Sequence, residues 1–260
     1  MSTLSEVFDR CSAEDRAALV AYLPAGFPDL DTSLEAVRAL AASGADVVEV
    51  GVPYTDPLMD GPVIEQAASR SLAGGFRLAR VFDLVRAVRE AGAVPVVMSY
   101  WNPVLHYGPE RFASDLAAAG GAGMITPDLV PDEADAWLQA AEAHDLDPVF
   151  LVAPSSTDAR LRSTAAACRG FVYVASTMGV TGTRSAVGGD AATLVERVRA
   201  VTDLPLCVGL GVSDGAQAHE VAAFADGVIV GSALVRAVDQ DPSLEALRTL
   251  TAELAAGVRR

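Results

Sequence analysis

Short apolar runs alternate along the chain with longer stretches in which apolar residues recur at helical spacing. The runs are rich in Val, Ile and Leu, as expected of buried strands. Strands are predicted at residues 18–23, 46–51, 95–100, 123–127, 148–153, 171–176, 206–209 and 227–230. Helices are predicted at residues 31–42, 77–91, 131–144, 191–201 and 243–256. This alternation is typical of a parallel sheet whose strands are joined by crossover helices.

The number of repeated units narrows the fold class. Eight strand–helix units fit within the 260 residues, whereas a doubly wound sheet usually stops at about five to seven strands. We therefore expect an α/β fold, a single (β/α)8 TIM barrel. No linker or low-complexity segment interrupts the alternation, so one domain is expected over residues 1–260. In such a barrel the active site lies where the strands end and the following loops begin.

Composition and charge exclude several kinds of partner. The chain carries 34 acidic and 19 basic side chains and a net charge of −15, so nucleic acid and anionic membrane surfaces would be repelled. The N-terminal segment lacks the basic flank and apolar run of a signal peptide, and no apolar segment is long enough to cross a membrane. We expect a cytoplasmic protein.

The absence of one residue type excludes several mechanisms. All 19 basic side chains belong to Arg, because the sequence contains no Lys. Schiff-base aldolases, covalently held pyridoxal phosphate and P-loop nucleotide hydrolysis each require a Lys amine. The three cysteines form no CxxC pair and are expected to be reduced and structural. His106, His144 and His219 lie far apart in the sequence, so no metal site is expected.

The segment EVGVPYTDPLMDGP at residues 49–62 carries the strongest candidate chemistry. Glu49 alternates with two valines near the end of a predicted strand, so its side chain points either into the barrel or toward the helices. A carboxyl group in an apolar pocket has a raised pKa and can transfer protons near neutral pH, and Asp60 could supply a second carboxyl group there. Alternatively, Glu49 pairs with an Arg, and Asp56 or Asp60 caps a helix that begins near Pro62. Spacing alone leaves both interpretations open.

Glycine-containing segments follow the last three predicted strands, at residues 179–183, 209–213 and 231–233. Glycine lets backbone N–H groups approach an anion, and the loops after the seventh and eighth strands of this fold commonly bind phosphate. Glycine also serves in tight turns, but its recurrence at these strand ends favours a phosphate ligand.

Aromatic residues are concentrated in a predicted loop at residues 99–108, which includes Tyr100. They could face a flat apolar substrate or a protein partner, or they could pack over the end of the barrel. Tyr22, Leu151 and Tyr173, near the ends of other strands, could line the same pocket or fill the top layer of the core.

Over essentially its whole length the chain resembles the α subunit family of tryptophan synthases. The resemblance rests on residues 49–62, Gly-Val-Thr-Gly at 179–182, Gly-Leu-Gly-Val at 209–212 and Val-Gly-Ser-Ala at 230–233, which match the family's motifs in order and spacing. It implies retro-aldol cleavage of indole-3-glycerol phosphate to indole and glyceraldehyde 3-phosphate. Asp60 would contact the indole N–H, and Glu49 would transfer protons at the ring carbon and the glycerol hydroxyl.

The resemblance also implies a substrate-binding set. Thr181 would contact Asp60 when its loop closes over the site. The positions implied around the phosphate and the indole are Gly182, Gly211, Gly231 and Ser232, and Tyr22, Tyr100, Leu151, Tyr173 and Leu210, respectively. The sequence departs from the family at Thr177 and Met178, where other members carry Arg and Ser before the glycine, so loop closure is expected to differ.

The family further implies a β-subunit partner, in an α2β2 assembly, that holds the pyridoxal phosphate and receives the indole. The loop residues that would face it are Pro53, Tyr54, Asp56, Asn102 and Pro103. Two alternatives are another phosphosugar barrel enzyme, such as indole-glycerol-phosphate synthase or phosphoribosylanthranilate isomerase, and a non-catalytic barrel that regulates a partner. The absence of Lys disfavours the synthase, and the presence of both Glu49 and Asp60 disfavours the non-catalytic barrel.

Overall fold

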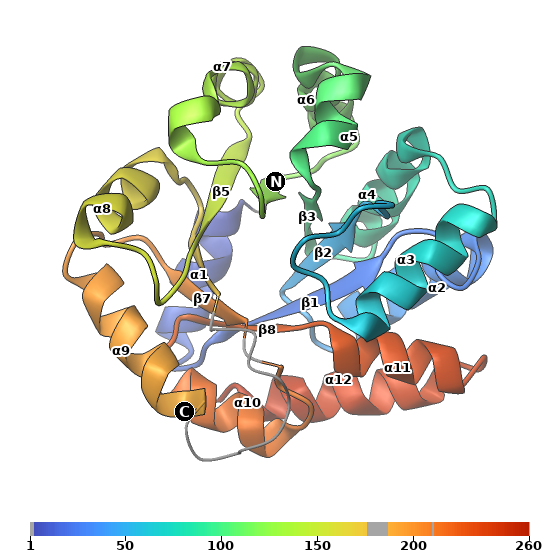
Figure 1. Cartoon of the computed structure of the whole chain (residues 1–260). Helices are drawn as coiled ribbons and strands as arrows, with labels where there is room; N and C mark the ends of the chain where they lie inside the picture. Colours follow the sequence, from blue (N-terminus) through green and yellow to red (C-terminus); the bar gives the residue numbers. More distant parts are fainter. Residues whose placement is uncertain (1–2, 176–186, 210, 260) are drawn as a thin grey trace.

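The strands close into a barrel in which each strand pairs in parallel with its neighbours in the chain, and β8 returns to pair with β1 (Figure 1). The computed structural model describes residues 3–175, 187–209 and 211–259. The strands are β1 (Ala18–Pro24), β2 (Val47–Gly51), β3 (Val94–Met98), β4 (Gly123–Thr126), β5 (Asp147–Val152), β6 (Val172–Ala175), β7 (Leu206–Gly209) and β8 (Gly227–Val230). The predicted TIM barrel is confirmed.

Helices surround the barrel and connect successive strands (Figure 1). They are α1 (Leu4–Ala13), α2 (Leu30–Ala42), α3 (Pro62–Ala73), η1 (Leu78–Arg80), α4 (Val81–Glu90), α5 (Trp101–Tyr107), α6 (Pro109–Ala118), η2 (Pro131–Glu133), α7 (Asp135–Ala143), α8 (Asp158–Ala167), α9 (Val187–Arg199), α10 (Gly215–Ala222), α11 (Ser232–Gln240) and α12 (Glu245–Gly257). Within the described ranges, no helix combines the length and apolar character needed to cross a membrane.

The strands are apolar on both faces because each face is buried against a different layer. Val48 and Val50 of β2 belong to the outer core, between the strands and the helices. Val47 of the same strand packs with Val94 and Ile125 in a second core inside the barrel. Strand residues therefore alternate between the two cores, and this alternation decides which side chains can reach the barrel interior.

Helix α1 contributes the apolar plug at the end of the barrel where the strands begin. Its residues Leu4, Val7 and Phe8 are buried in the inner core, and the Phe8 ring lies 5.8 Å from that of Phe171. A capping box at Thr3 fixes the start of the helix, because the Thr3 hydroxyl accepts from the Glu6 N–H and the Glu6 carboxylate accepts from the Thr3 N–H. The opposite end of the barrel is therefore the one available for a site.

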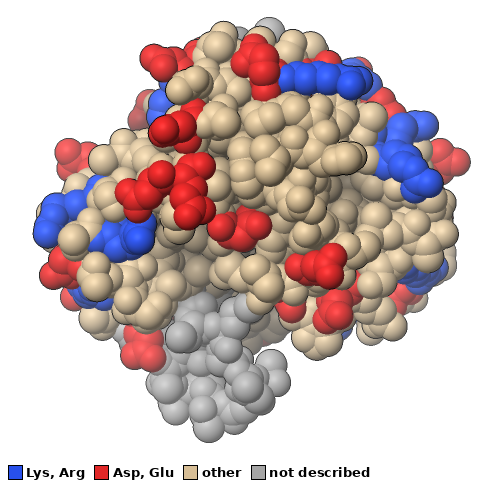
Figure 2. Space-filling model, turned by 45° about the horizontal axis from the view of Figure 1, so that its top comes forward, with Lys and Arg blue, Asp and Glu red and all other residues tan. Residues whose placement is uncertain are grey.

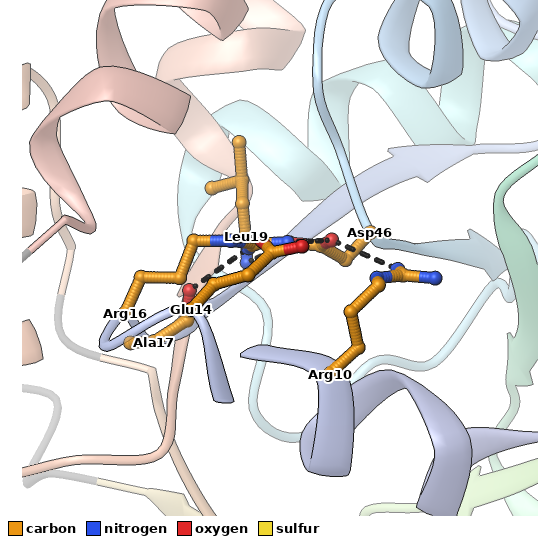
Figure 3. Close-up of polar contacts among 6 residues, drawn as sticks. All are labelled: Arg10, Glu14, Arg16, Ala17, Leu19 and Asp46. Atoms are coloured by element: carbon orange, nitrogen blue, oxygen red, sulfur yellow. Dashed lines mark hydrogen bonds and ion pairs between the residues drawn. The ribbon is translucent and has the colours of Figure 1, made fainter. Parts of the chain in front are cut away.

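Asp46 ties α1 and the chain before β1 to the start of β2 (Figure 3). Its carboxylate accepts two hydrogen bonds from Arg16, at 2.7 and 2.8 Å, one from Arg10 and one from the Leu19 N–H. Burial alone would raise the pKa of Asp46, but the hydrogen bonds from Arg16 and Leu19 outweigh it and hold the pKa below its usual value. The side chains of Asp46 and Arg16 are only 7% and 11% exposed, so they form a largely buried ion pair, to which Arg16 adds a hydrogen bond to Glu14 at 2.6 Å.

The prediction of a loop at residues 99–108 was wrong, because residues 101–107 form helix α5. The Trp101 N–H at its first position donates to the Asp128 carboxylate, at 2.9 and 3.2 Å to the two oxygens. Val104 on its inner side is fully buried. The residue that caps this helix and the residues that bury Val104 are distant in the sequence. The Pro- and aromatic-rich segment alone therefore did not indicate a helix. The predicted helices at 77–91 and 131–144 each begin instead with a 3₁₀ turn.

Candidate active site

Glu49 lies on the inner face of β2. Its neighbours Val48 and Val50 face the helices, and in the parallel ladder Glu49 registers with Tyr22 of β1 and Val96 of β3. Its side chain is 0% exposed, and neither carboxyl oxygen makes a hydrogen bond within the described residues. Among the described residues, no Arg pairs with Glu49, which was the alternative interpretation of this residue.

Burial raises the pKa of Glu49 from 4.5 to about 8. At neutral pH the group is therefore mostly a neutral carboxylic acid, which can donate a proton. An unpaired buried carboxyl group destabilises a fold, because its desolvation is not offset by hydrogen bonds. Its presence on the inner face of a strand that leads to the barrel mouth is more typical of a proton-transfer group than of a structural one.

Asp60 lies on the loop between β2 and α3, and Tyr100, at the end of β3, donates its hydroxyl proton to Oδ1 of Asp60 at 3.2 Å. Burial raises the pKa of Asp60, the hydrogen bond from Tyr100 opposes that rise, and the nearby carboxylate of Glu65 adds to it. Neither Asp60 nor Asp56 caps α3, because its N-cap is Gly61 without a side-chain hydrogen bond. The capping alternative is therefore wrong.

A small cavity at the mouth brings three of the predicted residues together. Its lining comprises Tyr22, Val52, Asp60, Met98, Ser99, Tyr100 and Pro127. Gly51 leaves the space that the Tyr22 side chain occupies in the cavity lining, since a side-chain Cβ at position 51 would overlap the Tyr22 hydroxyl. Glu49 lies directly beside Tyr22 in the strand register, so the two candidate acids are on adjoining parts of the same mouth.

The other predicted aromatic and apolar positions belong to the barrel interior. Leu151 of β5 registers with Tyr173 of β6, and both side chains pack against the inner core. Burial raises the pKa of the Tyr173 hydroxyl well above its usual value, and the nearby Glu49 carboxyl group adds to the rise. Tyr173 and Glu49 therefore face the same interior space.

The described part of the predicted phosphate site consists of Gly211, Gly231 and Ser232. Gly211 has φ +67°, in the left-handed region that favours glycine. Gly231 is the N-cap of α11 but offers no side-chain cap, and Ser232 is the first residue of the helix. Strands β7 and β8, which lead into these segments, are adjacent in the barrel. The uncapped start of a helix beside a glycine turn can bind an anion through backbone N–H groups. Thr181, Gly182 and Leu210 lie outside the described residues.

Three of the residues predicted to face a partner, Tyr54, Asn102 and Pro103, lie together beside one pocket, and Pro53 and Asp56 lie on the same loop as Tyr54. The Asn102 side-chain amide donates to the Tyr54 hydroxyl at 3.2 Å, which joins the loop after β2 to helix α5. A pocket of about 280 Å³ beside them is lined by Tyr54, Leu78, Asn102, Pro103, His106 and Tyr107. Leu58, on the loop after β2, is 79% exposed. On the face drawn in Figure 2, basic side chains lie toward the periphery.

Sequence reasoning missed two residues of this region, Ser99 and Asp128. Ser99 lines the cavity, and Asp128 caps α5. The signal for Asp128 was its position just beyond the end of β4, where a parallel barrel gathers its functional side chains. No pattern in the sequence links it to Trp101, 27 residues earlier.

Comparison with known proteins gives one consistent family. The family model described as tryptophan synthase alpha chain matches residues 8–259. The tryptophan synthase alpha chain of Mycobacteroides abscessus is 63% identical over 257 residues, covering 99% of this chain and 97% of that relative. A crystal structure of tryptophan synthase from Mycobacterium tuberculosis matches with a TM-score of 0.95 and 59% identity, covering 100% of this chain and 99% of the other. The alpha subunit from Legionella pneumophila matches with a TM-score of 0.89 and 30% identity, covering 99% and 98% of the two chains.

Proposed function

Because the chain belongs to the tryptophan synthase alpha chain family, we propose that it cleaves indole-3-glycerol phosphate to indole and glyceraldehyde 3-phosphate. The observation that carries the proposal is the Glu49 carboxyl group, which is fully buried on the inner face of β2 and unpaired among the described residues. Asp60 adds a second, hydrogen-bonded carboxyl group at the same mouth. Two carboxyl groups in different environments can divide acid and base roles.

The reaction breaks the bond between indole C3 and the glycerol chain. Neutral Glu49 donates its proton to C3, and the resulting indolenine accepts the electron pair of the breaking bond. The Glu49 carboxylate then takes the proton of the chain hydroxyl, the carbon bearing that hydroxyl becomes the aldehyde, and Glu49 is again neutral. Glu49 thus donates one proton to C3 and regains one from the hydroxyl.

Asp60 would bind the indole N–H during this sequence. Protonation at C3 places positive charge on the ring nitrogen, and a carboxylate beside the N–H stabilises it. The hydrogen bond from the Tyr100 hydroxyl favours the ionised form of Asp60 and so supports this role. Because the indolenine itself accepts the electron pair, the cleavage requires no Lys amine, which this sequence lacks.

The substrate phosphate would be held by Gly211, Gly231 and Ser232, through backbone N–H groups and the Ser232 hydroxyl at the start of α11. The indole would lie among Tyr22, Tyr100, Leu151 and Tyr173. Thr181, Gly182 and Leu210 complete the proposed set and remain predictions from family resemblance.

A tryptophan synthase β subunit is the proposed partner, in an α2β2 assembly. The solved Mycobacterium tuberculosis relative is a tryptophan synthase. The joined Tyr54 and Asn102 side chains and the exposed Leu58 give the loop after β2 and helix α5 a shared face for such a partner. Pyridoxal phosphate would belong to the β subunit, since a Schiff base needs a Lys amine that this chain does not contain. The cytoplasmic location stays a prediction.

The test is indole release from indole-3-glycerol phosphate by the purified chain, alone and with an added β subunit, for the wild type and Asp60→Asn. We expect slow release alone, faster release with the partner and a loss of at least about 100-fold in the variant. An absence of indole release by the wild type under both conditions would exclude the proposed activity. Fast release without a partner would instead indicate an independent indole-releasing lyase.

A further inference from the structure

One peptide unit at the mouth of the barrel is held by side chains at both of its polar atoms. This unit joins Tyr100 to Trp101. The Ser99 hydroxyl donates to its carbonyl oxygen at 2.8 Å, and its N–H donates to the Asp128 carboxylate at 2.9 and 3.2 Å. Ser99 is only 1% exposed, and its own N–H donates to the Ile125 carbonyl of β4. The backbone that carries the Ser99 hydroxyl is therefore held in place.

The side chain of Tyr100, the first residue of this peptide unit, contacts the candidate catalytic residue Asp60. The Tyr100 hydroxyl accepts from the Met59 N–H at 3.0 Å and donates to Asp60 Oδ1 at 3.2 Å. Tyr100 is the N-cap residue of α5, yet its side chain makes no capping hydrogen bond. Asp128 supplies the helix cap by accepting from the Trp101 N–H.

We propose that Ser99 and Asp128 are positioning residues, which fix the Tyr100–Trp101 peptide so that the Tyr100 hydroxyl stays on the carboxyl group of Asp60. The effect on catalysis rests on the proposed function, whereas the effect on Asp60 itself does not. We call Ser99, Asp128 and the peptide unit that they hold the clamp. Ser99 directly follows β3 and Asp128 lies on the loop after β4, so the clamp joins the ends of two neighbouring strands.

The geometry makes the contact sensitive to this clamp. A tyrosine hydroxyl lies at the far end of a long rigid side chain, so a small rotation of the peptide moves it through a larger distance. The 3.2 Å separation from Asp60 is already long for an O–H···O hydrogen bond, so a further shift of about 0.5 Å would break it. The tilted Tyr54 ring, whose centroid lies 5.3 Å from that of Tyr100, limits sideways motion but does not set the hydroxyl direction.

The alternative is that Asp128 only stabilises helix α5. The two roles differ in what they do to Asp60, whose titratable neighbours among the described residues are Tyr100, Glu65, Tyr22 and Tyr173. Donation from Tyr100 lowers the pKa of Asp60. Release of the clamp therefore raises that pKa, whereas loss of a cap with Tyr100 still in place leaves it unchanged.

The experiment compares Asp128→Ala with Asp128→Asn, which retains an acceptor for the Trp101 N–H. Asp29→Ala is the matched control: Asp29 is an exposed aspartate whose carboxylate caps α2 through the Thr32 N–H, without a connection to Asp60. For each variant we would measure the pKa of Asp60 by carbon-13 NMR, assigned with Asp60→Asn, and kcat/KM for indole release across pH. Ser99→Ala tests the other half of the clamp and serves if Asp128→Ala does not fold.

We expect Asp128→Ala and Ser99→Ala to raise the pKa of Asp60, shift the acid limb of kcat/KM to higher pH and lower kcat/KM at neutral pH about fivefold, less than the loss of a whole hydrogen bond to a charged group would cause. Asp128→Asn should remain near the wild type, and Asp29→Ala should not move the acid limb. In a Tyr100→Phe background the Asp128→Ala effect should disappear.

An unchanged pKa of Asp60 in both Asp128→Ala and Ser99→Ala, or an Asp128→Ala effect that persists in full in the Tyr100→Phe background, would overturn the positioning role. If the wild type releases no indole, the proposed function fails, but the NMR titration still decides whether the clamp acts on Asp60.

Discussion

The Tyr100 hydroxyl donates a hydrogen bond to Oδ1 of Asp60 while it accepts one from the Met59 N–H. Through these two bonds, the segment after β3 holds the loop after β2 in place over the barrel mouth. The same bond affects chemistry, because it opposes the rise in the pKa of Asp60 that burial causes. One side chain thus links loop geometry to the charge of a proposed catalytic group.

Substitution Tyr100→Phe should therefore weaken catalysis more at low pH than at high pH. Loss of the donor raises the pKa of Asp60, so a larger fraction of Asp60 is protonated below neutral pH and cannot bind the indole N–H as a carboxylate. At neutral pH we expect kcat/KM to fall about tenfold, as for the loss of a hydrogen bond to a charged group. A pH profile that keeps the wild-type acid limb would contradict this prediction.

The stability of the protein should decrease with rising pH because of Glu49. Its pKa is raised from 4.5 to about 8 in the fold, so its contribution is fully present below pH 4.5 and is lost as the pH rises through 8. Between these values the single group lowers the free energy of unfolding by about 1.4 kcal/mol per pH unit.

Glu49→Gln removes this titration. Chemical unfolding of both proteins at pH 5.5 and pH 8.5 should show the variant gaining stability relative to the wild type at the higher pH. A difference between the two proteins that does not change with pH would show that Glu49 titrates normally.

Asp46→Ala should be one of the most destabilising single substitutions away from the mouth. It removes two hydrogen bonds from Arg16, whose side chain is 11% exposed, and leaves this charge with the partly exposed Glu14 as its remaining carboxylate partner. We expect a loss of about 3–5 kcal/mol in the free energy of unfolding. Asp239→Ala is the control, because its pair with Arg70 is exposed on both sides and should contribute about 1 kcal/mol at most.

The effect of Asp46→Ala should depend on pH in the opposite sense to that of Glu49. The pKa of Asp46 is held below 3.8 in the fold, so the stabilising contribution is present above that value and is lost as the pH falls through the lower folded pKa. Denaturation of wild type and variant should converge in acid. Equal stability losses for Asp46→Ala and Asp239→Ala near neutral pH would refute the buried-pair assignment.

Gly211→Ala should raise KM for the phosphorylated substrate several-fold. The residue has φ +67°, and, apart from its chain neighbours, no heavy atom of the described residues lies within 4 Å of the place that a side-chain Cβ would occupy, so the cost is conformational, about 1–2 kcal/mol. Asn tolerates this region better, and Gly211→Asn should be milder. Gly75→Ala, at φ +85° and equally open, should lose similar stability without a change in KM. Equal KM values for Gly211→Ala and the wild type would remove Gly211 from the phosphate site.

Much of the fold followed from local patterns because each strand is buried on both faces and reads as an apolar run. Periodicity could not decide which face of β2 is the inside of the barrel, since Val48 and Val50 are buried as fully as Glu49. Nor could it show α5, whose cap at Asp128 comes from the next strand end. Both depend on contacts between distant residues. The organisation of residues 1–260 as one domain stays a prediction.

Glu49 is the proposed proton donor and proton acceptor of the cleavage. The most direct measurement is indole release from indole-3-glycerol phosphate at neutral pH by wild type and Glu49→Gln, with circular dichroism to establish that the variant is folded. Glutamine keeps the size of the side chain but cannot donate its proton to carbon, so we predict a loss of about 100-fold or more. A folded Glu49→Gln variant as active as the wild type would show that Glu49 does not transfer these protons.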